Sequence, residues 1–224
     1  GTVVGSHCVL TGWTTIGARN QIFTGAVIGS ITQDLKYKGE KSFVEIGDAN
    51  IIREYVTVNL ATEEGGTTVI GNENLLMAYS HVAHDCRIGN GVVMANVATL
   101  AGHVTVEDNV ILGGLVAIHQ FVTIGAYAMI GGGTLVGVDI LPYTIATMSR
   151  RDAKLRGLNL IGLKRRGFSD QAISNLKTAY KILFMSDLKL PEAVERIKAE
   201  ITGCPEVDYM LDFIARSQRG ICRG

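Results

Sequence analysis

The sequence contains little of what several classes of protein require. Of its 224 residues only three are proline, and 14 carry aromatic rings, one of them tryptophan. No apolar run approaches the roughly 18 residues that a membrane-spanning helix needs, so we expect no membrane insertion. The four cysteines show no CxxC spacing, which favours reduced thiols in an intracellular, cytoplasmic protein over a disulfide framework.

The chain also lacks net charge, because 21 basic residues balance 21 acidic ones. This balance argues against a dedicated nucleic-acid-binding protein. It conceals an uneven distribution: residues 1–137 hold 6 basic and 11 acidic residues, whereas residues 138–224 hold 15 basic and 10 acidic ones. Seven of the basic residues lie between Arg150 and Arg166, a segment in which Asp152 is the only acidic residue. Such a basic patch would steer an acidic partner toward the chain.

Glycine and aliphatic residues are abundant, and they repeat with a period of six. Every sixth position from Val4 to Val136 is aliphatic in 20 of 23 cases, and the three exceptions are acidic. A period of six matches neither an α-helix nor a simple strand, but it is typical of a β-solenoid built from hexapeptides. Glycine often follows the repeated aliphatic residue, where we expect it to allow unusual backbone angles and close approach at corners. Separate strands joined by glycine turns would not keep one phase over this length.

This pattern resembles the hexapeptide-repeat acyltransferase superfamily, whose fold is a left-handed parallel β-helix. The resemblance implies that three hexads close one triangular coil, so that residues 18 apart stack about 4.8 Å from each other. We expect the solenoid to span residues 1–137. Because the chain begins at Gly1 within the repeat, we also expect residues upstream of it.

Two polar segments interrupt the repeat, and a different pattern follows it. Residues 30–45 and 59–69 are predicted to leave the solenoid as loops, which either carry function or are neutral insertions. Residues 138–167 are predicted to be an irregular, basic connection. Residues 168–224 are predicted to form a small helical domain, with one helix behind an N-cap at Ser169, a second from Pro191 to about Glu200 and a third from Pro205.

Four of the five histidines are grouped in the later, unbroken part of the solenoid, namely His81, His84, His103 and His119. The stacking distance of 18 places Gly102 one coil beyond His84, and it places Asp85 against His103. A histidine group could bind zinc. It matches no long-range pattern of zinc-binding histidines, so we expect no metal.

A proton-transfer role suits these histidines better than a metal site does. A neutral imidazole such as that of His84 can accept a proton from a hydroxyl group. Gly102 could offer an unobstructed N–H to an oxyanion. Asp85 could orient His84 only if the corner turns its carboxylate back, because adjacent strand residues otherwise point to opposite faces.

Six motifs occur in order along the chain: QDLKY (33–37), NLLM (74–77), HVAHDC (81–86), LAGHV (100–104), IHQF (118–121) and GLKRRGF (162–168). Together they resemble the UDP-N-acetylglucosamine 3-O-acyltransferases over nearly the whole chain. The resemblance implies transfer of an (R)-3-hydroxyacyl group from the phosphopantetheine of acyl carrier protein to the 3-hydroxyl of UDP-N-acetylglucosamine, the first step of lipid A biosynthesis. It further implies a homotrimer with sites between subunits, and no metal or other cofactor.

The same resemblance implies a role for particular residues. His84 would be the general base, Asp85 its orienting partner and Gly102 the oxyanion donor. The remaining positions are substrate-binding: Asp34 and Lys36 for the sugar, His81, His103, His119 and Gln120 for the pocket lining, Gly132 for the acyl chain, and Asn159, Arg165 and Arg166 for the nucleotide.

The chain departs from the family pattern at three places. Asn59 stands where the family often has His, and Ile161 stands where a nucleotide-contacting Glu often lies. Residues 148–151 replace a Gly-Asn-His pattern, which leaves open whether Arg150 helps to set the acyl length. Four alternatives remain at this stage: the N-acyltransferase that acts later in the pathway, an acetyl-CoA-dependent acetyltransferase, a zinc carbonic anhydrase and a noncatalytic scaffold. The GLKRRGF segment and the helical tail favour the O-acyltransferase.

Overall fold

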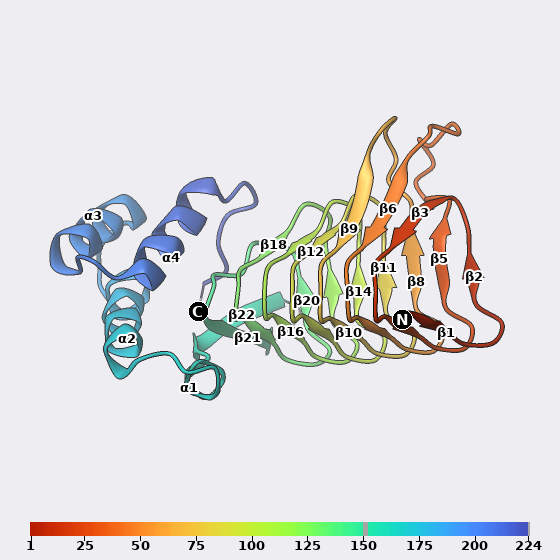
Figure 1. Cartoon of the computed structure of the whole chain (residues 1–224). Helices are drawn as coiled ribbons and strands as arrows, with labels where there is room; N and C mark the ends of the chain where they lie inside the picture. The colour runs from red at the N-terminus through yellow and green to blue at the C-terminus, as the bar shows by residue number, and fades with distance from the viewer. Residues whose placement is uncertain (150–151, 224) are drawn as a thin grey trace.

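The computed structural model describes residues 1–149 and 152–223 (Figure 1). A left-handed parallel β-helix of triangular cross-section forms the first part of the chain, and a group of helices lies at its far end. Short strands form the three flat faces, and within the solenoid each strand pairs in parallel with the strands of the adjacent coils. The predicted fold class is therefore confirmed.

The three faces are sheets of nine, seven and six strands. The nine-stranded sheet contains β1 (Val3–Val4), β4 (Gln21–Ile22), β7 (Ile51–Ile52), β10 (Leu75–Leu76), β13 (Val93–Met94), β16 (Ile111–Leu112), β19 (Met129–Ile130), β21 (Thr144–Ser149) and β22 (Asp152–Leu158). The seven-stranded sheet contains β2 (Val9–Leu10), β5 (Val27–Ser30), β8 (Thr57–Asn59), β11 (His81–Val82), β14 (Thr99–Leu100), β17 (Ala117–Ile118) and β20 (Leu135–Val136). The six-stranded sheet contains β3 (Trp13–Ile16), β6 (Phe43–Ile46), β9 (Thr67–Ile70), β12 (Arg87–Ile88), β15 (Thr105–Val106) and β18 (Thr123–Ile124).

The register between coils follows the predicted spacing except where the loops intervene. Val82 pairs with Leu100, at the predicted separation of 18. Ile28 pairs with Val58 at a separation of 30, and Val58 pairs with Val82 at a separation of 24. The first loop therefore lengthens its coil by two hexads and the second by one. Both loops rise from the body of the solenoid beside β6 and β9 (Figure 1). They are shorter than predicted, spanning residues 31–42 and 60–66 between strands.

A single column of aliphatic side chains fills the solenoid. From β4 onward the second residue of each two-residue strand is buried in the interior, and Leu76, Val82 and Leu100 are typical in being fully buried. The narrow triangular interior has room for branched aliphatic residues from each face, which explains the shortage of aromatic residues. Each coil thus buries its apolar positions against the coils above and below it.

At the corners of the solenoid, the residue with left-handed backbone angles occupies a different position from the one predicted. The residue three after the inward aliphatic one has positive φ, as in Asp85 (60°) and His103 (61°). Gly89, which directly follows an inward isoleucine, does not have positive φ. Its role is close approach, because a Cβ atom there would lie 2.2 Å from the Asp108 carboxylate of the next coil. The prediction of close approach holds at most of these glycines, whereas the prediction of unusual backbone angles holds among them at Gly29, whose φ is 83°.

The segment 138–167 is more regular than predicted, and this prediction was wrong. Strands β21 and β22 pair in an antiparallel fashion and extend the nine-stranded sheet, and α1 (Leu160–Arg165) follows them. Arg150 and Arg151 lie outside the described residues. The hairpin covers the end of the aliphatic column, since Ala146 is fully buried and Leu155 is 5% exposed.

The remaining helices form a second small core at this end of the solenoid. They are α2 (Asp170–Phe184), α3 (Leu190–Glu200) and α4 (Pro205–Arg216). The Ser169 side chain caps α2 as predicted, by accepting a hydrogen bond from the N–H of Ala172. Glu107 of the solenoid ties α4 in place by accepting hydrogen bonds from Tyr209 and Arg216. No helix among the described residues is long and apolar enough to span a bilayer.

Candidate functional site

The three edges of the solenoid carry different side chains, and one residue gives each edge its name. The His84 edge comprises the turns from the seven-stranded to the six-stranded sheet, including residues 83–86, 101–104 and 119–122. The Tyr127 edge comprises the turns from the six-stranded to the nine-stranded sheet, including residues 107–110 and 125–128. The Leu115 edge comprises the turns from the nine-stranded to the seven-stranded sheet, including residues 113–116 and 131–134.

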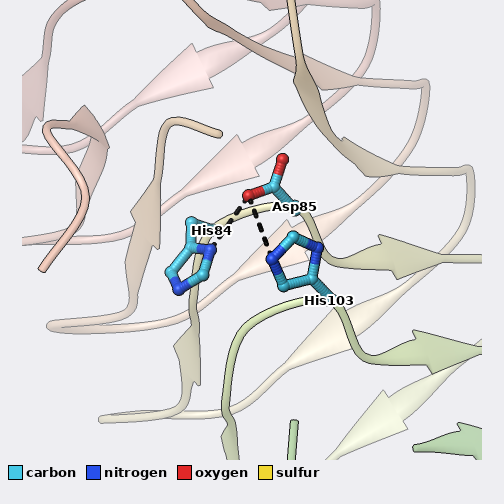
Figure 2. Close-up of side chains that lie close together, drawn as sticks. All are labelled: His84, Asp85 and His103. Carbon is cyan, nitrogen blue, oxygen red and sulfur yellow. Dashed lines mark hydrogen bonds and ion pairs between the residues drawn. The ribbon is translucent and has the colours of Figure 1, made fainter. Parts of the chain in front are cut away.

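His84, Asp85 and His103 converge on the His84 edge (Figure 2). Nδ1 of His84 lies 2.9 Å from Oδ2 of Asp85, and Nε2 of His103 lies 3.8 Å from the same oxygen. The two imidazole rings meet edge to face, with centroids 5.1 Å apart. His84 is 6% exposed, so its ring is held by protein on most sides.

The left-handed backbone at Asp85 makes the pairing of neighbouring residues possible. In an extended strand the side chains of residues 84 and 85 would point to opposite faces. The φ of 60° at Asp85 turns its carboxylate back toward the preceding histidine. Burial alone would raise the pKa of Asp85, but hydrogen bonds from Thr62 and His84 outweigh it and lower the pKa below its ordinary value. Asp85 is therefore an ionised acceptor, and it favours the tautomer of His84 in which Nδ1 carries the proton.

Gly102 provides the space in which the His84 ring lies. A Cβ atom on Gly102 would be 2.2 Å from Cε1 of His84 and 2.4 Å from Nε2. The N–H of Gly102 makes no hydrogen bond within the described residues, whereas the N–H of His103 next to it donates to the carbonyl of His84. Position 102 thus combines a free N–H donor with direct contact to the imidazole.

Both loops of the solenoid contribute to a cavity beside these residues. The cavity has a volume of about 470 Å³ and is lined by Asp34, Lys36, Tyr37, Glu40, Thr62, Glu63, Glu64, His103 and Phe121. Asp34 reaches the histidine itself, with Oδ2 3.9 Å from Nε2 of His84. Phe121 stacks on His103 with ring centroids 4.5 Å apart, which fixes one wall. The predicted sugar-contacting residues Asp34 and Lys36 therefore share one cavity with His103.

The chain is similar to known proteins over almost its full length. The acyl-(acyl-carrier-protein)–UDP-N-acetylglucosamine O-acyltransferase of Trichlorobacter lovleyi is 66% identical over 207 residues, which is 92% of this chain and 79% of the relative. The corresponding protein of Thermodesulfovibrio yellowstonii is 56% identical over 224 residues, covering 100% and 86% of the two chains. The chain belongs to the UDP-N-acetylglucosamine O-acyltransferase family.

Structural and family-model comparisons agree with this membership. The crystal structure of a UDP-N-acetylglucosamine acyltransferase from Bacteroides fragilis superimposes with a TM-score of 0.95 at 47% identity, covering 99% of this chain and 86% of that one. Residues 139–222 match the model of the second domain of UDP-N-acetylglucosamine O-acyltransferases, and residues 67–102 match the bacterial transferase hexapeptide model.

Three further residues predicted for the substrate pocket lie near the His84 edge. His81 on β11 makes a 2.7 Å hydrogen bond through Nδ1 to the Thr57 hydroxyl, and burial followed by the nearby charge of His84 lowers its pKa. His119 and Gln120 are exposed at the end of β17. His119 lies 3.3 Å from the guanidinium of Arg219 near the chain's end, so the tail also reaches this edge.

The other predicted residues lie on different edges of the same chain. Gly132 belongs to the Leu115 edge. Asn159 lies against the Tyr127 edge, where its amide donates to the carbonyl of Tyr127 and its oxygen accepts from the N–H of Gly162, capping α1. Arg166 contacts the Asn109 side chain and lies over the Tyr127 ring. One chain therefore does not bring the predicted nucleotide residues to the predicted base.

Helix α1 presents its exposed face away from the solenoid. Ile161 is 68% exposed there, one turn before Arg165. Arg165 is exposed and makes no side-chain hydrogen bond or ion pair within the described part of the chain. Its guanidinium is thus available to an anionic ligand.

Sequence reasoning missed Thr62, which donates to Asp85 from the second loop. The regular spacing of 18 does not connect these residues. The spacing across this loop is 24, as the pairing of Val58 with Val82 shows, and it places residue 61 against residue 85. Adding the inserted hexad to the regular spacing of 18 would have placed the second loop beside Asp85.

Proposed function

We propose that this protein transfers an (R)-3-hydroxyacyl group from acyl carrier protein to the 3-hydroxyl of UDP-N-acetylglucosamine, the first step of lipid A biosynthesis. The names of its 66% and 56% identical relatives specify this type of donor and acceptor. The observation that carries the proposal is the contact of buried His84 with half-buried Asp85 beside the cavity, together with Gly102, which lies against the His84 ring and whose N–H has no hydrogen-bond partner among the described residues. The free thiols of the four cysteines suit a cytoplasmic location.

The proposed mechanism assigns one task to each of three groups. With Nδ1 donating to Asp85, Nε2 of His84 is the free base and takes the proton from the sugar 3-hydroxyl. The sugar oxygen then attacks the thioester carbon, and the N–H of Gly102 binds the oxyanion of the tetrahedral intermediate. When the carbon–sulfur bond breaks, the imidazolium returns its proton to the departing phosphopantetheine thiolate. The reaction needs no oxidant and no further cofactor, because the thioester is already activated.

The cavity side chains suit the acceptor sugar. Asp34 and Lys36 offer an acceptor and donors for sugar hydroxyls, and Asp34 lies close enough to His84 to place a hydroxyl beside Nε2. Such alignment supplies much of the rate enhancement when two substrates must meet.

A homotrimer would complete the site. The outward residues of the nine-stranded sheet form an apolar row that includes Leu75, Val93, Ile111 and Met129. Beside it, on the Leu115 edge, Leu115 is 65% exposed. A row of this kind suits contact with another copy of the same chain. Neighbouring copies could then place the Arg166 region of one beside the His84 edge of the next.

The arginines of α1 fit the nucleotide in this arrangement. Arg165 is exposed and Arg166 projects from the same helix end, and forked guanidinium donors suit a pyrophosphate. The basic segment that contains them also suits acyl carrier protein, an acidic partner, through electrostatic steering.

The proposal is tested by an assay that measures transfer of the (R)-3-hydroxyacyl group from loaded acyl carrier protein to UDP-N-acetylglucosamine. We expect the wild-type protein to catalyse transfer, and we expect His84→Ala to lower kcat by about 10²-fold or more because the base is lost. Full activity of His84→Ala would refute the mechanism.

His84, Asp85 and His103 also offer ligand atoms within 4.8 Å of one another, so metal analysis of the purified active protein should accompany the assay. Stoichiometric zinc would contradict the metal-free mechanism.

A further inference from the structure

The oxygen of Asp85 that faces His84 is held by a second residue. Oδ2 accepts hydrogen bonds from the backbone N–H of Thr62 at 3.1 Å and from its hydroxyl at 2.6 Å. The same oxygen accepts the bond from Nδ1 of His84 at 2.9 Å. Thr62 therefore fixes the carboxylate by a two-pronged contact to the one atom that orients the imidazole.

The position of Thr62 is itself well determined. It follows Leu60 and Ala61, which are 4% and 0% exposed. The N–H of Leu60 donates to the carbonyl of Ser30 at 2.8 Å, and the Ser42 hydroxyl donates to the carbonyl of Ala61 at 2.6 Å. The two loops of the solenoid thus lock together at their bases, and Thr62 is the residue by which they reach the carboxylate.

A carboxylate without this contact would have a choice of partners. Its Oδ2 lies 2.9 Å from Nδ1 of His84 but also 3.8 Å from Nε2 of His103, on the opposite side (Figure 2). Rotation toward His103 would release Nδ1 of His84 and allow the tautomer whose Nε2 carries the proton. That tautomer has no lone pair at the atom that must act as base. The orientation of Asp85 hence decides which nitrogen of His84 is basic.

We propose that Thr62 is a positioning residue for acyl transfer, which holds Asp85 toward His84 and so keeps Nε2 of His84 unprotonated. This role rests on the proposed function. It assigns a purpose to the second loop, which links the substrate cavity to the hydrogen bond behind the base.

The test compares three substitutions at the borders of the loop. Thr62→Val removes the hydroxyl but keeps the side-chain shape and the backbone N–H, and Thr62→Ser restores the hydroxyl. Thr67→Val is the matched control, because the hydroxyl of Thr67 on β9 makes no hydrogen bond within the described residues and valine suits a strand. We expect Thr62→Val to lower kcat about tenfold, the size expected for a lost hydrogen bond to a charged group, with KM for the nucleotide sugar changed less than threefold. Thr62→Ser and Thr67→Val should remain within threefold of the wild type.

Two readouts separate positioning from a merely structural role. Nitrogen-15 chemical shifts of the His84 ring should show the Nδ1-protonated tautomer in the wild type and a growing share of the other tautomer in Thr62→Val. In the Asp85→Asn background, Thr62→Val should cause no further loss of kcat, since it acts through the carboxylate. Equal losses in both backgrounds, or an unchanged tautomer, would overturn the inference. If Thr62→Val does not fold, as judged by circular dichroism, Thr62→Ala takes its place in both measurements.

The outcome is distinguishable from a failure of the proposed function. An inactive wild type, or a fully active His84→Ala, would reject the function. An active wild type that needs His84 but tolerates Thr62→Val rejects the positioning role alone.

Discussion

Replacing Gly102 by alanine adds a single methyl group against the base. The Cβ atom would lie 2.2 Å from Cε1 of His84, whereas ordinary van der Waals contact begins near 3.4 Å. The ring must therefore retreat by about 1 Å before the two carbon atoms reach an ordinary separation. Gly102 does not have positive φ, and Ala126 occupies the same corner position on the Tyr127 edge, so alanine is acceptable to the backbone. The expected damage is steric and local to the imidazole.

The loss of activity follows from this displacement. A misplacement of about 1 Å at a reacting group can cost about 10²-fold in rate, so we expect kcat/KM for transfer to fall by about that factor. The alanine variant keeps the backbone N–H at position 102. The loss would therefore report the moved base and not a deleted oxyanion donor. Steady-state transfer with saturating acyl carrier protein measures it.

Stability provides the internal control for this prediction. Overpacking at a buried contact costs about 1–3 kcal/mol, so Gly102→Ala should lower the free energy of unfolding measured in urea. In a His84→Ala background the ring is gone, and the same substitution should cost much less. If Gly102→Ala had the same kcat/KM and the same stability as the wild type, the reasoning would be refuted. The His84 ring would then have space for a methyl group at position 102, which the distance of 2.2 Å does not allow.

Two further predictions concern the carboxylate and the assembly. Because the pKa of Asp85 is lowered in the folded protein, its contribution to stability is present above the unfolded value of about 3.9 and is lost as the pH falls through the folded value. As the pH is lowered below about 4, the free energy of unfolding should thus decrease more steeply in the wild type than in Asp85→Asn. If the free energies of the two proteins changed in parallel with pH, the stabilising role of the Asp85 carboxylate would be contradicted. If each site uses the His84 edge of one subunit and α1 of the next, co-expressed His84→Ala and Arg166→Ala chains should regain about a quarter of wild-type activity by random assortment in a trimer. Activity no higher than that of either variant alone would argue for sites within single chains.

The periodic part of the fold was predictable because every coil obeys the same local rule. A six-residue aliphatic repeat places one inward side chain in each strand, and the solenoid buries these residues between adjacent coils. The offset of 18 followed from the triangular coil, and it correctly set Gly102 against the His84 ring and Asp85 beside His103. The prediction of helices behind Ser169 and Pro205 rested on capping chemistry, which is also local.

The non-periodic contacts depended on tertiary structure. The sequence left open whether Asp85 could reach His84, and the left-handed corner settles this by turning the carboxylate back. The excess of glycine suggested unusual backbone angles, yet Gly89 serves the close approach of neighbouring coils. The segment around Lys154 was expected to be irregular, but it pairs as a hairpin because that closes the open end of the aliphatic column.

The sequence by itself thus determined the solenoid, the family and the residues of the candidate base. Only the tertiary structure decided the contacts that lie outside the regular repeat. It joined Thr62 to Asp85 across the second loop, and it left Arg166 beside Asn109 on another edge. The physical reason is that a repeat specifies contacts at a constant separation. The orientation of a side chain such as Asp85 depends instead on donors that loops of irregular length bring to it.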